Sequence, residues 1–270
     1  MGGMDVRRVE SDGIELAVRD FGGPGPVLLA LHGHFGHGGV FAPLAEALAG
    51  RYRVVAPDQR SHGLSAHGGL LTPDAYVADA ATVIDALGTG PVAVLGHSMG
   101  AAVAFTLTAR RPSLVSALIN VDMTVLNTEP ETRPVLDVSD WPRRAPSRDA
   151  LREAVEAHGI PDASYFMDSA AEFEDGWGFL FDLDELMASQ RALVGDHSQA
   201  WRASARGGRP ALLLRGGETF MLSEPTAHRM VAERPGTTLV EMPGCGHWLY
   251  SDAPEAFARE VGDFLDRHPW

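Results

Sequence analysis

Residues Val92–Gly100, VAVLGHSMG, decide the fold of this chain of 270 residues. The short apolar run Val92–Leu95 predicts a buried strand, and the small, apolar stretch Ala101–Arg110 predicts a helix packed in the interior. Between them, the pattern Gly-x-Ser-x-Gly predicts a tight strand-to-helix turn with a serine at its tip. We therefore expect Ser98 to stand clear of the sheet near a helix N-terminus, where negative charge is favoured.

The same alternation of apolar runs and helix-like stretches extends in both directions from this segment. Further strands are predicted at Val27–Leu31, Arg53–Ala56, Leu118–Val121, Ala211–Leu214 and Thr238–Glu241, with an N-terminal hairpin of Val6–Glu10 and Ile14–Asp20. Helices are predicted at Phe41–Ala49, at Asp74–Leu87 and from Pro254 to about Leu265. This order predicts an α/β fold with a mostly parallel sheet and helices on both faces.

The alternation breaks between Met123 and Gly208. This stretch is rich in proline and tryptophan, its helix candidates are Arg148–His158 and Leu183–Val194, and it shows no strand signal. We therefore predict two parts: a core of residues 1–122 and 209–270, and a helical cap of residues 123–208 inserted over the sheet.

The composition limits the kinds of binding partner and the cellular compartment that we expect. The net charge of −14 disfavours nucleic acid and anionic membrane surfaces, so a small-molecule substrate is expected. The single cysteine, Cys245, suits a reducing compartment. No signal peptide or membrane-spanning run is evident, so we expect a cytoplasmic protein, as a monomer or homodimer.

A serine hydroxyl needs a base to become a good nucleophile, and His247 is the leading candidate. It follows the last predicted strand, which places it at the carboxyl edge of the sheet, where such folds carry their sites. The alternative is a loop histidine that only packs against Trp248. Cys245 lies two residues away, but no strand-to-helix turn surrounds it.

The loop His32–Gly36, HGHFG, follows the strand Val27–Leu31 and is suited to stabilising an oxyanion. Such a site needs two backbone N–H groups, which we expect from His34 and Met99. The histidines of this region could also suggest a metal site. No carboxylate lies among them to complete a ligand set, so neither a metal nor a cofactor is expected.

Taken in order, four segments resemble the signatures of the α/β-hydrolase superfamily. They are His32-Gly33, Asp58–Ser65, Gly96–Gly100 and Gly246-His247, with Ser61 where most members have glycine. The resemblance covers nearly the whole chain outside the insertion. It implies an α/β-hydrolase fold in which the insertion is a cap that roofs the pocket. It is closer to small-molecule esterases, lactonases and carbon–carbon bond hydrolases than to large lipases.

The acid that would complete a Ser–His–acid triad is not where the family usually has it. The family pattern places an aspartate after the strand Ala211–Leu214, but here Thr219 or Phe220 occupies that region, with Glu218 beside it. Asp122, at the end of the strand Leu118–Val121, is our first candidate and Glu218 the alternative. Two other possibilities stay open: Asp122 only caps the following loop, or no acid is used.

The candidate substrate-binding residues are aromatic. Phe35, Trp177, Phe220 and Trp248 are expected to line an apolar pocket, although the insertion's aromatic residues could instead form its own core. Together these features predict a serine hydrolase that cleaves a small apolar or aromatic ester or lactone through an acyl-enzyme. A carbon–carbon bond hydrolase, a cofactor-free dioxygenase and a non-catalytic receptor are the alternatives.

Overall fold

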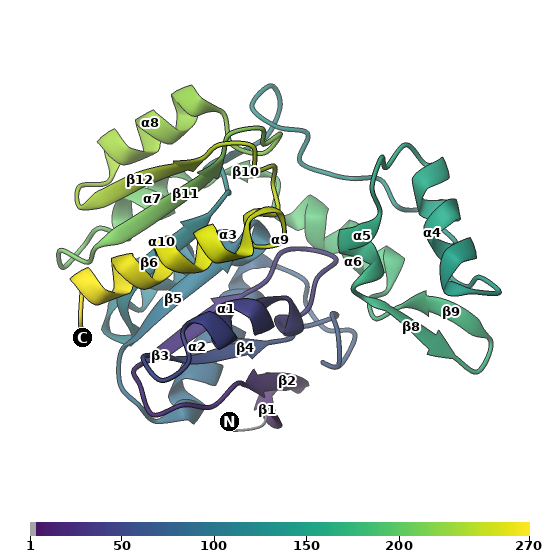
Figure 1. Cartoon of the computed structure of the whole chain (residues 1–270), viewed down its shortest axis with the longest axis horizontal. Helices are drawn as coiled ribbons and strands as arrows, with labels where there is room; N and C mark the ends of the chain where they lie inside the picture. The colour runs from purple at the N-terminus through teal and green to yellow at the C-terminus, as the bar shows by residue number, and fades with distance from the viewer. Residues whose placement is uncertain (1–3) are drawn as a thin grey trace.

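The computed structural model describes residues 4–270 and is built around one eight-stranded sheet (Figure 1). In spatial order its strands are β1 (Asp5–Ser11), β2 (Ile14–Asp20), β4 (Arg53–Pro57), β3 (Val27–Leu31), β5 (Val92–His97), β6 (Val115–Val121), β11 (Ala211–Gly216) and β12 (Thr237–Met242). The pairs β1–β2 and β2–β4 are antiparallel, and the other neighbours are parallel. The predicted α/β fold with a mostly parallel sheet is confirmed.

Helices cover both faces of this sheet. On one face lie α1 (Ala42–Ala47) and α10 (Pro254–Arg267); on the other lie α2 (Pro73–Leu87), α3 (Met99–Arg110), α7 (Ser198–Ala203) and α8 (Glu224–Glu233). The central strand β3 serves both layers, because successive side chains of a strand point to opposite faces. Leu28 packs into the first layer and Leu29 into the second, and both are fully buried.

Local sequence explains where the helices begin and end. In α2, the Thr72 hydroxyl accepts the Ala75 N–H, Pro73 is the first helical residue, and Gly88 ends the helix in the left-handed conformation at φ +63°. Short helical turns complete the core: η1 (Gly38–Phe41), η2 (Pro112–Leu114) and α9 (Leu249–Asp252). Within residues 4–270, no helix has both the length and the apolar character needed to cross a membrane.

Most of the predicted insertion, residues 123–208, extends beyond one end of the sheet (Figure 1). It contains α4 (Arg148–Ala157), α5 (Ser164–Met167) and α6 (Leu183–Ala192), as well as two small antiparallel pairs, β8 (Ala170–Phe173) with β9 (Gly176–Phe179) and β7 (Leu126–Asn127) with β10 (Gly195–Asp196). The insertion contains helices, as expected, and also four short strands for which the sequence showed no signal. These strands are only two to four residues long, too short for an alternating pattern to show.

The last helix of the insertion, α7, packs on the sheet layer rather than over the sheet edge. Its Trp201 is fully buried in the cluster that contains α3, and the indole N–H donates to the Met230 carbonyl at 2.7 Å. Trp141 and Trp177 pack with the other cluster, which joins the insertion's aromatic residues to the core.

Two buried ion pairs hold the loop after β4. The Asp58 carboxylate accepts two hydrogen bonds from Arg19, both at 2.9 Å, and the Arg60 guanidinium donates to both oxygens of Asp79 at 2.6 and 2.7 Å. Burial opposes the charged form of Asp58, but the hydrogen bonds and charge of Arg19, together with the hydrogen bond from the Leu64 N–H, outweigh burial and lower the pKa of this carboxyl. The sequence Asp58–Arg60 thus fastens the loop to β2 and α2.

Replacing Arg60 with methionine should destabilise the protein by about 3–5 kcal/mol, because it leaves the Asp79 carboxylate buried without its partner. Urea unfolding at pH 7 measures the loss. The matched control is Arg110→Met, which removes an exposed pair with Asp74 and should cost at most about 1 kcal/mol. Similar losses in the two variants would contradict this account.

Candidate active site

The turn after β5 holds Ser98 in an unusual backbone conformation, with φ +53° and ψ −122°. A side chain on either flanking glycine would prevent this turn. A methyl group on Gly96 would lie 2.1 Å from the Gly100 carbonyl oxygen, and one on Gly100 would lie 2.2 Å from the Leu31 carbonyl oxygen. The two glycines are therefore required by main-chain contacts.

Such a backbone conformation costs roughly 1–3 kcal/mol, so the surrounding structure must hold it. The Ser98 N–H donates to the Val121 carbonyl at 3.1 Å, and α3 begins at the next residue, Met99. The serine is 9% exposed and lines the pocket described below. The turn thus presents one side chain at the carboxyl edge of the sheet.

His247 and Asp122 meet at the same edge. The Nδ1–H group of His247 donates to Oδ2 of Asp122 at 2.7 Å, and the Asp122 side chain is completely buried. In the neutral ring this bond holds the proton on Nδ1, so Nε2 is the nitrogen that can act as a general base. His247 lines the same pocket as Ser98.

Two further hydrogen-bond donors reach the Asp122 side chain. Its Oδ1 accepts the Gly216 N–H at 3.1 Å, and its Oδ2 accepts the Thr219 hydroxyl. Thr219 lies where the family pattern would have an aspartate, and here it donates to the acid on the neighbouring strand. Asp122 has φ +50°, a conformation that aspartate tolerates better than most residues.

The structure does not bring Glu218 to the histidine. Glu218 is exposed, and its backbone N–H donates to the Cys245 carbonyl at 2.9 Å. In the described part of the chain, no hydrogen bond or ion pair joins its carboxylate to His247. Burial raises the pKa of the Cys245 thiol, which therefore stays protonated near neutral pH.

His97 holds the loop that carries His247, a role the sequence analysis missed. Its Nε2–H donates to the His247 carbonyl at 2.9 Å, and its Nδ1 accepts the Tyr250 hydroxyl at 3.3 Å. Burial lowers the pKa of His97 well below its ordinary value, so the ring is neutral. In the sequence, only the position of His97 next to Ser98 could have drawn attention to it. The Gly-x-Ser-x-Gly pattern allows any residue at this position, so it gave no reason to assign His97 a role.

The predicted oxyanion donors lie on either side of the serine turn. Met99 is the first residue of α3, where a backbone N–H has no partner within the helix. His34 follows β3 in the segment of residues 32–37, hereafter the oxyanion loop; within residues 4–270 its N–H donates to no protein acceptor. The next residue, Phe35, has φ +68°.

The histidines of this loop serve other contacts. His32 accepts the Gln59 N–H at 2.9 Å, and burial lowers its pKa to about 3. His37 caps η1 and donates to the Asp168 carbonyl at 3.1 Å. Within the described residues, no group of three or more histidine, cysteine, aspartate or glutamate side chains is arranged to hold a metal ion.

A pocket of about 480 Å³ opens over Ser98 and His247. Most of its walls are apolar, and they come from the oxyanion loop, the insertion and the loop after β11. Its lining residues are His34, Phe35, His97, Ser98, Arg133, Pro134, Val135, Leu136, Ile160, Pro161, Asp162, Tyr165, Phe166, Gln190, Phe220, Met221, His247 and Trp248.

Three of the four predicted aromatic residues line this pocket: Phe35, Phe220 and Trp248. The Phe220 ring is 60% exposed and lies 5.0 Å from the His247 ring. Trp177 does not line the pocket, which corrects its prediction as a substrate contact. It lies on β9, where its backbone pairs with Ala145.

The insertion supplies lining residues that the sequence analysis did not find, among them Arg133 and Gln190. They lie on a loop and on α6. No local pattern marks them, because the pocket forms only when the insertion folds back over the sheet edge.

With this geometry established, comparison with known proteins identifies the family. The model of the alpha/beta hydrolase family matches residues 27–260. The chain belongs to this family. The match covers β3 through the first half of α10, so it includes the serine turn, Asp122, His247 and the whole insertion.

Several relatives of this alpha/beta hydrolase are similar along most of their length. It is 30% identical to the 2-(acetamidomethylene)succinate hydrolase of Mesorhizobium japonicum, covering 96% of this chain and 95% of the relative. It is 28% identical to the sn-1-specific diacylglycerol lipase ABHD11 of Mus musculus, covering 89% and 81%. A crystal structure of E-2-(acetamidomethylene)succinate hydrolase superposes with a TM-score of 0.84 at 28% identity, covering 97% and 99%. These relatives support hydrolase chemistry but differ in substrate.

Proposed function

We propose that this alpha/beta hydrolase is a serine hydrolase that cleaves small esters or lactones through an acyl-enzyme. The observation that carries the proposal is the Asp122–His247 hydrogen bond, formed at the same pocket wall as Ser98 on its strained turn. A buried acid, an oriented histidine and a serine presented by Gly-x-Ser-x-Gly are the parts that acyl transfer requires.

The first half of the reaction forms the acyl-enzyme. His247 Nε2 removes the Ser98 hydroxyl proton as Oγ attacks the substrate carbonyl, and Asp122 stabilises the imidazolium that results. The carbonyl oxygen becomes an oxyanion, which the N–H groups of His34 and Met99 stabilise. His247 then gives its proton to the departing alkoxide, so the alcohol leaves and the acyl group remains on Ser98.

The second half restores the enzyme. Water takes the place of the alcohol, and His247 Nε2 removes its proton as it attacks the acyl carbonyl. A second oxyanion forms in the same two-donor site. Its collapse breaks the bond to Ser98 Oγ, which regains a proton from His247, and the carboxylic acid leaves.

Replacing Ser98 with alanine should abolish ester hydrolysis and labelling by a fluorophosphonate, because Oγ is the attacking atom. Intact-mass analysis measures labelling, and release of p-nitrophenol from p-nitrophenyl butyrate measures turnover. Undiminished turnover by this variant would refute the proposal. Binding of the ester without turnover by the wild-type protein would favour the receptor alternative.

Replacing Asp122 with asparagine should lower kcat by about 10³–10⁴-fold, because the histidine loses the partner that orients it and stabilises its charged form. The matched variant Glu218→Gln should keep kcat within about twofold of wild type, since its carboxylate makes no contact with His247. Steady-state kinetics with p-nitrophenyl butyrate tests both. The opposite order of effects would assign the acid to Glu218.

The apolar pocket walls suit a largely apolar substrate, and Arg133 suits a substrate that also carries a carboxylate. Arg133 lines the pocket and makes no ion pair within 4 Å among residues 4–270, whereas Asp162, also in the lining, is 3.8 Å from Arg152. An unpaired guanidinium at a pocket wall matches the geometry of a carboxylate. We propose that an ester with a carboxylate remote from the scissile bond is preferred over its neutral equivalent.

Monoethyl adipate and diethyl adipate provide a matched pair for this preference. Wild-type protein should show a higher kcat/KM for the monoester than for the diester. Arg133→Gln should reduce this ratio by roughly 5–10-fold, because an exposed charge-assisted hydrogen bond contributes about 1–1.5 kcal/mol. Most of the change should come from a higher KM for the monoester. Loss of preference without any change for the diester would support ion pairing. An equal preference in both proteins would exclude Arg133 as the carboxylate contact.

A further inference from the structure

The oxyanion loop is attached to the insertion by four hydrogen bonds. His34 Nε2 bonds to Ser189 Oγ at 2.9 Å, and the Tyr165 hydroxyl donates to the His34 carbonyl at 2.9 Å. The Ser169 hydroxyl donates to the Phe35 carbonyl at 2.6 Å. The fourth bond is the one from His37 to the Asp168 carbonyl. The insertion therefore holds both the side chain and the main chain of this loop.

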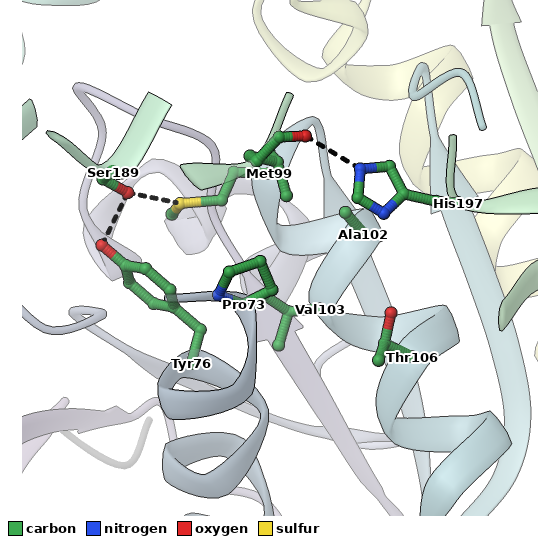
Figure 2. Close-up of a pocket in the computed structure, with 9 residues that line it drawn as sticks. Pro73, Tyr76, Met99, Ala102, Val103, Thr106, Ser189 and His197 are labelled. Atoms are coloured by element: carbon green, nitrogen blue, oxygen red, sulfur yellow. Dashed lines mark hydrogen bonds between the residues drawn. The ribbon is translucent and has the colours of Figure 1, made fainter. Parts of the chain in front are cut away.

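Ser189, on α6, contacts both residues whose N–H groups form the proposed oxyanion site. Besides His34, its hydroxyl lies 3.9 Å from Met99 Sδ, and the Tyr76 hydroxyl of α2 lies 2.8 Å away (Figure 2). Figure 2 shows Tyr76, Ser189 and Met99 converging on the small cavity behind the serine turn. One hydroxyl of the insertion thus connects α2, the oxyanion loop and the start of α3.

This contact is part-buried, with its shielded side at Ser189. Ser189 is 3% exposed, and burial together with the nearby His62 lowers the pKa of His34 well below its ordinary value. The backbone also needs support at this point, because Phe35 is held at φ +68°. The neighbour of Ser189, Gln190, lines the substrate pocket.

We infer that Ser189 is a positioning residue, which places the His34 and Met99 N–H groups for the oxyanion. The inference rests on the proposed function, because it assigns a role within that reaction. Oxyanion stabilisation depends on donors held at hydrogen-bonding distance from the charged oxygen, so a displaced loop weakens the transition state more than the bound substrate. Through α6, the element that contacts substrate also holds the oxyanion loop.

Replacing Ser189 with alanine should therefore lower kcat about 10–50-fold while KM for p-nitrophenyl butyrate stays within about threefold. Affinity for 1,1,1-trifluoro-4-phenylbutan-2-one, which forms a tetrahedral oxyanion adduct with the serine, should fall by a similar factor.

Ser169→Ala, which frees the Phe35 carbonyl, should lower both kcat and the affinity for this inhibitor. The matched control is Ser116→Ala, which removes a buried hydroxyl without a hydrogen-bond partner, on β6, and should leave both unchanged.

The outcomes separate this inference from the proposed function. If Ser98→Ala abolishes turnover but Ser189→Ala and Ser169→Ala keep wild-type kcat and inhibitor affinity, the positioning role is wrong and the hydrolase proposal stands. A loss carried by KM alone would also overturn it. Thermal unfolding identifies any variant that is not folded at the assay temperature, and the other variant then decides the result.

Discussion

The strained turn at Ser98 is the constraint on which the site depends. Ser98 has φ +53°, and around it the main chain of α3 passes so close to β5 and β3 that side chains at Gly96 or Gly100 would block the approach. The turn is held by the hydrogen bond from Ser98 N–H to the Val121 carbonyl, which belongs to the neighbouring strand β6. The residue that follows this strand is Asp122, so the bond that stabilises the serine also holds the end of the strand that carries the acid.

The pairing of β6 with β11 explains how the acid can follow β6 instead of β11. The two strands are paired in parallel, with Val121 opposite Leu214, so their carboxyl ends lie side by side. A carboxylate from either strand can therefore reach His247 Nδ1. The β11 side supplies the Gly216 N–H and the Thr219 hydroxyl to Asp122, which satisfies the buried charge at its new position.

The insertion and the oxyanion loop form one connected unit at the other side of the serine. Phe35 packs its ring against Trp141, Phe166 and Phe181 of the insertion while its carbonyl accepts the Ser169 hydroxyl. Apolar packing and hydrogen bonds thus act on the same residue. Divergence in the insertion can change both the pocket wall and the support of the oxyanion loop, which links substrate choice to the chemistry in this architecture.

The sequence by itself determined the sheet and the serine turn, because short apolar runs and the Gly-x-Ser-x-Gly pattern are local signals. It also placed Asp122 ahead of Glu218 as the candidate acid, but it could not decide which carboxylate approaches His247. It could not indicate the β8–β9 hairpin, the absence of Trp177 from the pocket, or the contacts of Ser189 and His97. Those features arise where segments far apart in the chain meet, as Ser189 does with His34 and His97 does with the His247 carbonyl. Only the tertiary structure decides such pairs, because each depends on the register of the strands and the folding of the insertion over the sheet edge.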